Sequence, residues 1–316
     1  MKALVTGAAG FIGSHVLAAL VASGAQVRGF DRATPGDLPA GAEFVQGDLL
    51  DRDALRHALT GCDAVFHLAA LYSYSPGDAA AMERVNVQGT RAVIEEAGSR
   101  RIVHTSSCAT CGPVAGRAAT EADTPAPWEL RVPYKRTKIA GEQLMLDAAA
   151  QGANVVIVNP TTPVGPGDLR PTPTGKMVAD VVSGRARAYL AGSALNVVAV
   201  EDVARGHLLA CERGRVGQRY LLGGENLSMQ EVFSAICAAV GRSAPRLAVP
   251  WRAAFCAAWV ASHVVHEPRL LLLDGVRVAR WPMRFDDSLA RAELEYTSEP
   301  AASALARAAR AVAPRA

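Results

Sequence analysis

The sequence predicts an α/β fold: a doubly wound parallel sheet with a smaller C-terminal cap. Two observations support this prediction. In the N-terminal half, short runs rich in β-branched residues alternate with longer helical stretches. These runs are apolar throughout instead of alternating with polar residues, which indicates strands buried on both faces between layers of helices.

The elements follow one another in a regular order. The expected strands are residues 3–6, 26–30, 43–46, 64–68, 102–105 and 155–159. The expected helices are residues 12–22, 51–59, 80–97 and 134–150. Strand–helix–strand units with right-handed crossovers build a doubly wound sheet of Rossmann type, which binds ligands at the carboxyl ends of its strands.

After Pro160 the pattern loosens. Residues 160–175 are rich in Pro, Gly and Thr and are expected to form a loop, and an Ala/Arg-rich helix is expected near 300–312. We therefore divide the chain into a sheet domain, 1–160, and a substrate-binding region, 161–316, partly interleaved with it.

Composition excludes several classes of protein. A net charge of +3, without a block of basic and aromatic residues, argues against a nucleic-acid partner. Glycines interrupt the start of the chain where a signal peptide would need a continuous apolar run, and the six cysteines show no disulfide-framework spacing. A cytoplasmic protein with reduced thiols is expected.

One apolar stretch needs its own explanation. The run from Trp251 to Val265 contains Arg252 and His263 and is shorter than the roughly 18 residues of a membrane-spanning helix. We predict that this run, with 270–273, forms an apolar cap over the site. Such a cap is also compatible with peripheral contact at a membrane surface.

A glycine-rich turn follows the first strand. In GAAGFIG, Gly7 permits a tight turn, Gly10 lets the backbone approach a pyrophosphate, and Gly13 allows close helix–strand packing. The helix that begins at Phe11 and Ile12 would direct its free N–H groups at the phosphates. The turn predicts a dinucleotide site.

Two residues at the end of the second strand bear on which dinucleotide binds. Asp31, 18 residues after Gly13, is placed to bind the adenine-ribose hydroxyls and favours NAD. Arg32 follows it, and its guanidinium could accept the 2′-phosphate of NADP. NAD is therefore the expected cofactor, with NADP as the alternative.

A tyrosine and a lysine lie four residues apart in the helix 134–150. Only four of the 33 basic residues are lysines, so the spacing of Tyr134 and Lys138 is informative. On one helix face, the ammonium would lower the phenol pKa toward working pH. A phenol tuned in this way could exchange a proton with a carbonyl or alcohol oxygen while a hydride moves to or from nicotinamide.

Serines and cysteines compete for a role in TSSCATCGP, residues 105–113. Cys108 and Cys111 form a Cys-x-x-Cys pair, but no second pair exists to complete a metal site, so no metal is expected. A redox role would need the pair at the start of a helix in the first βαβ unit. Small buried thiols that lie within reach of thiol reagents are the simpler interpretation.

The G-x-x-G-x-x-G turn and Tyr-x-x-x-Lys resemble the extended branch of the short-chain dehydrogenase/reductase superfamily, also called the NAD-dependent epimerase/dehydratase family. The segments VNPTTPVGP, VEDVARGHLLACERG and FDDSLARAELEY fit the same resemblance, which covers nearly the whole chain. With PTPTGKMV, the pattern is most similar to the groups called hopanoid-associated sugar epimerases and dihydroflavonol 4-reductase-like proteins.

The resemblance implies roles for further residues. Ser107 matches the catalytic serine, with Ser106 as the alternative after a one-residue slip, and Asn86 matches a buried asparagine behind the site. The implied cofactor contacts beyond the turn and the Tyr/Lys pair are Asp48, Leu49, Leu68, Ala69, Ala70, Pro160 and Thr161. A homodimer is also expected, because extended-branch members often pair through the tyrosine-bearing helix and its neighbour.

Three functions remain open at this stage. The first is reversible ketone/alcohol oxidoreduction on a small apolar substrate, such as an isoprenoid, polyketide or aromatic ketone. The second is a nucleotide-sugar epimerase or dehydratase with tightly held NAD, for which Arg170, Arg185, Arg187, Arg213 and Arg219 could bind a diphosphate. The third is a non-catalytic protein that senses the cofactor.

Overall fold

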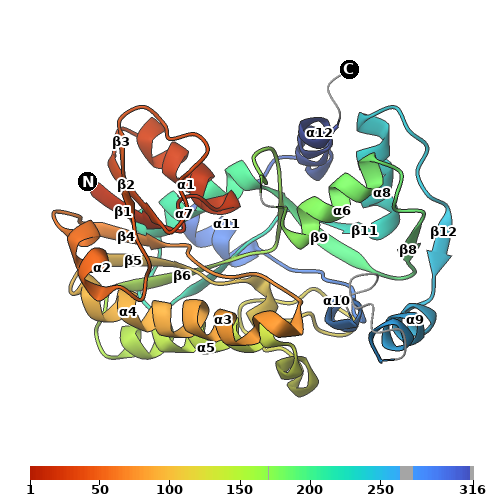
Figure 1. Cartoon of the computed structure of the whole chain (residues 1–316), viewed down its shortest axis with the longest axis horizontal. Coiled ribbons are helices and arrows are strands. Elements are labelled where there is room, and N and C mark those ends of the chain that lie inside the picture. Colours follow the sequence, from red (N-terminus) through yellow and green to blue (C-terminus); the bar gives the residue numbers. More distant parts are fainter. Residues whose placement is uncertain (170, 264–272, 314–316) are drawn as a thin grey trace.

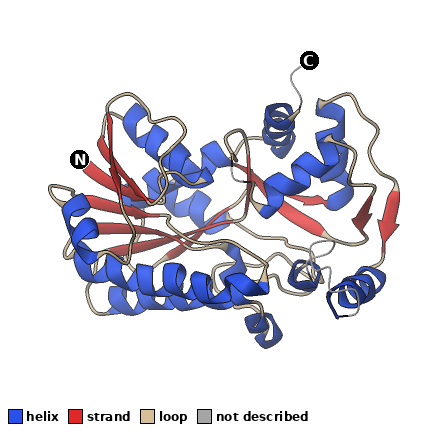
Figure 2. Cartoon of the chain, in the orientation of Figure 1, coloured by secondary structure: helices blue, strands red, loops and turns tan. Residues whose placement is uncertain are grey.

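A computed structural model of the chain describes residues 1–169, 171–263 and 273–313. Its main element is a seven-stranded parallel sheet of order β3-β2-β1-β4-β5-β6-β10, which confirms the predicted doubly wound fold (Figures 1 and 2). The strands are β1 Lys2–Thr6, β2 Gln26–Asp31, β3 Ala42–Gln46, β4 Ala64–His67, β5 Arg101–Thr105, β6 Val155–Pro160 and β10 Arg219–Leu222. The strand order reverses between β1 and β4, where such sheets bind their ligands.

Helices cover both faces of this sheet, as the uninterrupted apolar strands require. On β1, Ala3 and Val5 pack toward one helical layer, whereas Leu4 packs toward the other. The first layer is α1 Phe11–Ala22, α7 Val200–Arg213 and α11 Ser288–Leu294. The second is α2 Arg52–Leu59, α4 Gly89–Ala97 and α5 Pro133–Ala150. Burial on both faces explains why these strands lack polar alternation.

The expected helix 80–97 is not one α-helix. The structure contains α3 Ala79–Met82, a π-helical turn Glu83–Gln88 and then α4. A π turn inserts an extra residue into the helical ladder, and such turns are frequent at functional sites. Here the turn contains Asn86, which the apolar pattern alone could not distinguish from an ordinary helical residue.

A smaller lobe is built from the C-terminal half. It contains a sheet of order β11-β9-β7 and a pair β12-β8. Its strands are β7 Thr162–Val164, β8 Ala188–Leu190, β9 Ala194–Ala199, β11 Glu225–Ser228 and β12 Leu247–Val249. Its helices are α6 Pro173–Val182, α8 Met229–Ala239, α9 Trp251–His263, α10 Leu273–Val278 and α12 Ala301–Val312.

The expected loop 160–175 is partly wrong. Thr162–Val164 forms β7, which pairs in parallel with β9, and α6 already begins at Pro173. The Thr172 side chain caps α6 by accepting a hydrogen bond from the Gly175 N–H. Proline is tolerated in the first helical turn because the N–H it lacks has no intrahelical partner there. The proline-rich sequence therefore predicted a loop where the helix in fact begins.

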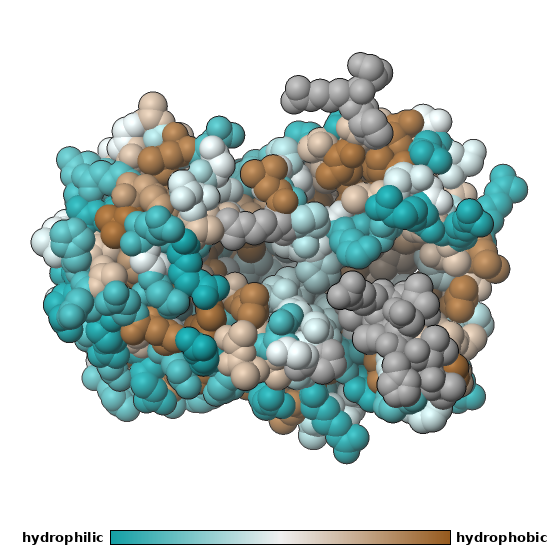
Figure 3. Space-filling model, in the orientation of Figure 1, coloured by the Kyte–Doolittle hydropathy of each residue, from teal (hydrophilic) through white to brown (hydrophobic). Residues whose placement is uncertain are grey.

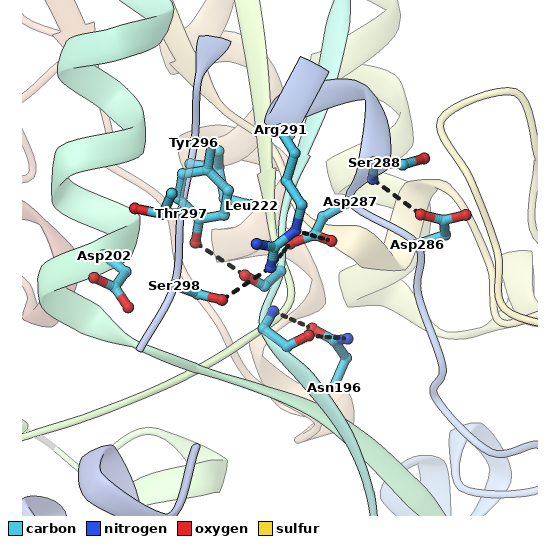
Figure 4. A network of polar contacts seen from close by, with 12 residues as sticks. Asn196, Asp202, Leu222, Asp286, Asp287, Ser288, Arg291, Tyr296, Thr297 and Ser298 are labelled. Carbon is cyan, nitrogen blue, oxygen red and sulfur yellow. Dashed lines mark hydrogen bonds and ion pairs between the residues drawn. The ribbon is translucent and has the colours of Figure 1, made fainter. Parts of the chain in front are cut away.

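Polar contacts fix the junction between the two lobes (Figure 4). Asn196 on β9 accepts a hydrogen bond from the Gly224 N–H at 2.8 Å and donates one to the Asn226 side chain at 2.9 Å. The Tyr296 hydroxyl donates to the Gly223 carbonyl at 2.9 Å. The chain is thus held as it passes from β10 of the large sheet into β11 of the small one.

Within the described ranges, no helix is both long enough and apolar enough to span a bilayer.

Helix α5 approaches the π turn so closely that its glycine leaves no room for a side chain. A Cβ at Gly141 would lie 2.6 Å from the Asn86 carbonyl oxygen. We expect Gly141→Ala to lower the free energy of unfolding by about 2 kcal/mol, since the overlap outweighs the gain of about 1 kcal/mol in helix propensity. Urea denaturation measures the change. The control is Gly77→Ala, whose Cβ would meet only the Ser75 hydroxyl, at 3.8 Å; equal losses in both variants would contradict the expectation.

Candidate active site

A large pocket opens at the carboxyl edge of the main sheet, between the two lobes. It encloses about 1690 Å³ of empty space including its open mouth, and the space-filling view shows the surface hollowed there (Figure 3). Most of the predicted site residues line it. These are Gly7, Gly10, Phe11, Ile12, Gly13, Leu68, Ala70, Ser107, Tyr134, Lys138, Pro160 and Thr161.

The glycine turn is at the switch point of the sheet. Gly7 has a φ of +72°, and a Cβ there would lie 2.6 Å from the Ala69 nitrogen. A Cβ at Gly13 would collide with the Gly7 carbonyl oxygen. Gly10 precedes α1 without a side-chain cap, and no acidic residue lies in the first turn of α1. The helix start therefore keeps free N–H groups and positive dipole for an anionic ligand.

Asp31 ends β2 beside this turn. Its carboxylate accepts hydrogen bonds from the backbone N–H groups of Ala9, at 3.1 Å, and Ala33, at 3.0 Å. Arg32 faces a different acid, Asp48, at 3.7 Å, and both side chains are largely exposed. The arginine is thus drawn toward a carboxylate, which competes with any phosphate for it.

Like Asp31, four other predicted cofactor contacts are not among the residues that line the pocket. They are Arg32, Asp48, Leu49 and Ala69, of which Ala69 lies directly against Gly7. The Ala69 N–H donates to the Thr6 hydroxyl at 3.4 Å, which fastens the end of β4 to β1.

The two serines after β5 differ in exposure. The Ser107 side chain is half-buried, and its hydroxyl accepts a hydrogen bond from the Ala109 N–H at 3.2 Å. Ser107 also lowers the Tyr134 pKa through a side-chain hydrogen bond. The Ser106 hydroxyl is buried and has no partner among the described residues. This geometry favours Ser107 as the serine that meets a reacting oxygen.

Lys138 lies at the bottom of the pocket. Its ammonium donates to the Thr105 carbonyl at 2.8 Å. Burial lowers the pKa of Lys138 to about 8, and nearby Glu142 opposes the shift only in part. The amine therefore titrates close to neutral pH, which suits a group that takes part in proton transfer.

The expected lowering of the Tyr134 pKa is not found. Burial raises the pKa of Tyr134 above its usual value, and Ser107 counters only part of this rise. The lysine ammonium is engaged by the Thr105 carbonyl, and desolvation of the phenol dominates instead. At neutral pH the phenol is protonated and can donate a proton.

Asn86 positions the backbone behind the site and does not line the pocket. Its side-chain oxygen accepts from the Leu71 N–H at 2.7 Å, and its amide donates to the Leu71 carbonyl at 3.0 Å. The same amide donates to the Thr137 hydroxyl on α5 at 3.1 Å. Asn86 thereby links the segment after β4 to the helix that bears Tyr134 and Lys138.

A buried polar network, missed by sequence reasoning, holds the Ser107 loop. Glu142 on α5 accepts from the Thr110 hydroxyl at 2.8 Å and from the Asn159 amide at 2.6 Å. Its second oxygen pairs with Arg219 of β10 at 2.9 Å. The Asn159 amide also donates to the Ser107 carbonyl at 3.1 Å. The sequence signal was available, since Glu142 follows Lys138 by four residues on the same helix face.

Two tyrosines were also missed. Tyr72 and Tyr74 line the pocket and surround Tyr134, with ring centroids 4.3 Å and 6.1 Å from it. The Tyr72 hydroxyl donates to the Tyr74 hydroxyl at 3.2 Å. Both follow HLAA at the end of β4, a position from which side chains reach the carboxyl edge of the sheet.

The pocket walls are apolar, and flexible thioethers contribute to them. Met177, Met229 and Met283 line the pocket, three of the six methionines in the chain. Among the described lining residues only Lys135 and Lys138 are charged, and Lys135 is neutralised by an ion pair with the buried Glu129. The pocket therefore suits an uncharged ligand portion.

The predicted cap is only partly correct. Gly275, Val278 and Ala279, in or next to α10, line the pocket, whereas no residue of α9 does. Helix α9 instead packs behind α10, with Ala254 and Ala258 buried against Val276. Residues 270–272 lie outside the described ranges.

The cysteine pair is buried and inert. All six cysteines are free, and burial raises the pKa of Cys108 and of Cys111 to about 12. A thiol held in its neutral form is a poor nucleophile, which argues against redox chemistry and against the expected access for thiol reagents. The described residues contain no group of His, Cys, Asp and Glu that could hold a metal ion.

Comparison with known proteins gives a consistent result. The profile of the NAD dependent epimerase/dehydratase family matches residues 3–223. A Synechocystis protein with the provisional name dihydroflavonol 4-reductase is 39% identical over 317 residues, covering 96% of this chain and 92% of that protein. Sterol demethylase protein B of Methylococcus capsulatus is 39% identical over 259 residues, covering 80% and 78%.

Solved structures resemble the whole chain. The crystal structure of gox2253 superposes with a TM-score of 0.85 at 35% identity and covers 98% of this chain and 97% of that one. The structure of MoeE5 in complex with UDP-glucuronic acid and NAD superposes with a TM-score of 0.77 at 26% identity, covering 98% of both chains.

Burial of the charged Lys138 ammonium lowers the free energy of unfolding at neutral pH, because the ammonium loses its hydration on folding. The folded pKa, about 8, lies below the ordinary value of 10.5, so the folded chain binds fewer protons than the unfolded chain between these pH values. We expect Lys138→Met to raise the free energy of unfolding at pH 7 by about 1–3 kcal/mol. The gain should shrink as the pH rises from about 8 toward 10.5, where the unfolded lysine also loses its proton.

Urea denaturation at pH 7 and near pH 9.5 measures this gain. The matched control is Lys176→Met, because Lys176 is 70% exposed and only forms a surface pair with Asp180. Its effect should stay within about 0.5 kcal/mol. A Lys138→Met variant that is less stable than the parent at pH 7 would contradict this expectation. It would show that the hydrogen bond from the ammonium to the Thr105 carbonyl stabilises the fold by more than burial of the charge destabilises it.

Thiol accessibility gives a second prediction. Cys256 is exposed on α9, Cys211 is half-buried, and Cys62, Cys108, Cys111 and Cys237 are buried. We expect a chromogenic disulfide reagent to modify one thiol rapidly in the native chain and the buried thiols only after unfolding in guanidinium. Cys256→Ser should abolish the rapid phase; a rapid phase that persists in this variant and disappears in Cys108→Ser would contradict the inert assignment.

Proposed function

Because this chain belongs to the NAD-dependent epimerase/dehydratase family, we propose that it catalyses reversible hydride transfer between nicotinamide and a ketone or secondary alcohol on an apolar substrate. Membership makes the chain an NAD(P)-dependent enzyme. The observation that carries the proposal is the pocket, which joins the glycine turn to Ser107, Tyr134 and Lys138 with apolar walls.

The proposed chemistry divides between cofactor and protein. NAD(P)H, when bound, supplies the hydride that reduces the carbonyl carbon. Tyr134 gives its phenolic proton to the carbonyl oxygen, so that the product is an alcohol and the cofactor is left oxidised. Ser107 donates a hydrogen bond to the same oxygen. Lys138 stabilises the resulting phenolate as a nearby cation.

The protonation state of Tyr134 supports the reductive direction at neutral pH. Burial raises the phenol pKa, so the form present before the reaction is the proton donor. Oxidation of an alcohol would instead start from the phenolate, which is scarce at neutral pH. The same enzyme would run in that direction as the pH rises.

Apolar walls support the substrate class. Tyr72 and Tyr74 offer ring faces beside Tyr134, and three methionines supply adaptable apolar surface. The sterol named for the Methylococcus relative is a substrate of this kind. We propose an isoprenoid, polyketide or aromatic ketone.

The alternative is a nucleotide-sugar epimerase or dehydratase, supported by the likeness to MoeE5 with its UDP-sugar and NAD. A diphosphate needs basic partners. Among the candidate arginines, Arg185, Arg213 and Arg219 are paired with Asp180, Glu295 and Glu142 respectively. Arg187 is exposed and does not line the pocket, and Arg170 is outside the described residues. Because three of the arginines are already paired with carboxylates, they are poor partners for a diphosphate, and this favours the apolar substrate.

We also propose NAD as the preferred cofactor, a homodimer and a cytoplasmic location. Asp31 beside the glycine turn would repel a 2′-phosphate, and Asp48 engages Arg32. The homodimer would pair α4 and α5, as the extended-branch resemblance implies. The six free cysteines suit a reducing compartment.

The test follows nicotinamide absorbance with a panel of apolar ketones and, separately, UDP-sugars. Net oxidation of added cofactor by an apolar ketone is expected. Tyr134→Phe should lower kcat by about 10²- to 10⁴-fold, because it removes the proton donor and leaves the ring. The control is Tyr189→Phe, which alters a half-buried ring packed on Phe233 away from the pocket.

The alternatives predict other results. Tightly retained NAD, with turnover of a UDP-sugar and no net change in cofactor, would replace the proposal by an epimerase or dehydratase. Cofactor binding with no turnover on either panel would favour the non-catalytic interpretation.

A further inference from the structure

Helix α9 exposes apolar side chains on the face that an ordinary surface helix keeps polar. Trp259 is 46% exposed and Val260 is 44% exposed, and Ala253, Cys256 and Ala257 are exposed beside them. Helical spacing places all five on one face, opposite the buried Ala254 and Ala258. Contiguous exposed apolar surface of this kind marks an interaction site.

Basic groups lie at both ends of this face. Arg252 is exposed at the start of α9 and His263 at its end, where its ring stacks on Trp259 at 4.9 Å. Just before α9, Leu247 on β12 is 62% exposed and Arg246 is exposed next to it. We call Arg246, Leu247 and the exposed residues of α9 the α9 face.

None of the described residues that make up the α9 face is acidic. The sequence from 232 to 263 contains three arginines and no carboxylate. The next described acid, Asp274, is paired with Arg277 at 2.7 Å. Apolar side chains with tryptophan, flanked by arginine, form the composition that binds at the headgroup region of an anionic bilayer.

The α9 face belongs to a helix that packs against α10, which lines the active-site pocket. Figure 1 shows α9 and α10 side by side at one end of the molecule, next to β12. The Trp251 indole donates to the Val276 carbonyl at 2.7 Å, which fastens α9 to α10. Helix α10 in turn supplies Val278 to the pocket wall. A surface bound at the α9 face would therefore lie one helix away from the pocket.

We propose that the α9 face docks the enzyme on an anionic membrane surface, from which its apolar substrate enters the pocket beside α10. The substrate part of this inference rests on the proposed function, whereas the docking part does not. A second copy of the chain is a poorer occupant, because a two-fold interface would bring the same arginines against each other. An anionic lipid surface complements them.

The test is flotation of the full chain with vesicles of phosphatidylcholine alone or mixed with phosphatidylglycerol, without substrate. Binding to the anionic vesicles is expected, weakening with added salt. The double variant Trp259→Ser/Val260→Ser should bind at least about tenfold more weakly, since it removes two apolar side chains from the contact. Arg252→Glu should weaken binding to the anionic vesicles only.

Matched controls alter exposed residues elsewhere. Leu38→Ser/Val216→Ser removes apolar side chains that are 40% and 52% exposed, and Arg310→Glu reverses an exposed charge on α12. Both should bind as the parent does, and thermal unfolding should show all variants folded. Trp259→Phe should keep binding but lose fluorescence quenching by brominated lipids, which would identify the residue that enters the bilayer.

Several results would overturn the proposal. One is that the chain does not float with anionic vesicles at low salt, and another is that the α9 variants and the control variants lose vesicle binding equally. A third is that the chain is a dimer which Trp259→Ser/Val260→Ser converts to a monomer. Ketone reduction in detergent is measured separately. A docking failure with intact reduction rejects the membrane surface alone, whereas flotation without reduction rejects the proposed function alone.

Discussion

The Glu142 carboxylate is the constraint on which the arrangement of the site depends. It is buried on α5, one turn beyond Lys138, and binds Thr110 after β5, Asn159 on β6 and Arg219 on β10. Three segments distant in sequence therefore converge on one charge. A buried carboxylate is tolerable only when it is paired and fully hydrogen-bonded, so these partners cannot drift independently. The Asn159 amide also donates to the Ser107 carbonyl, so the Glu142 carboxylate indirectly fixes the position of the serine.

The order of the sheet and the position of the glycine turn could be predicted from local pattern. Six strands of the main sheet were expected within two residues of their observed bounds, because burial on both faces leaves a continuous apolar signal. The seventh, Arg219–Leu222, was not assigned, since its place next to β6 is fixed by long-range pairing. Gly7 and Gly13 were identifiable because only glycine tolerates the contacts that they make.

The chemistry of the site was less accessible to sequence. Tyr134 and Lys138 were found by spacing and Ser107 through resemblance, but the Tyr134 pKa depends on burial, which spacing does not report. Asn86 was identified through resemblance, whereas its π turn depends on how α5 packs at Gly141. Tyr72 and Tyr74 lie in a loop without periodicity, so only the fold reveals that they surround Tyr134. The predicted cap wrongly included α9 beside the pocket wall, because both apolar runs look alike in sequence and only tertiary packing distinguishes α9 from α10.

The methionines of the pocket wall make the enzyme sensitive to oxidative conditions. Peroxide converts a thioether to a sulfoxide, which is polar and stiffens an adaptable side chain. Met177, Met229 and Met283 all face the pocket, whereas the Cys108 and Cys111 thiols are held in the unreactive neutral form. Within the pocket, oxidative damage would therefore begin at these methionines and not at Cys108 or Cys111, and methionine sulfoxide reductases could reverse it. Loss of affinity for an apolar ligand would precede loss of the fold.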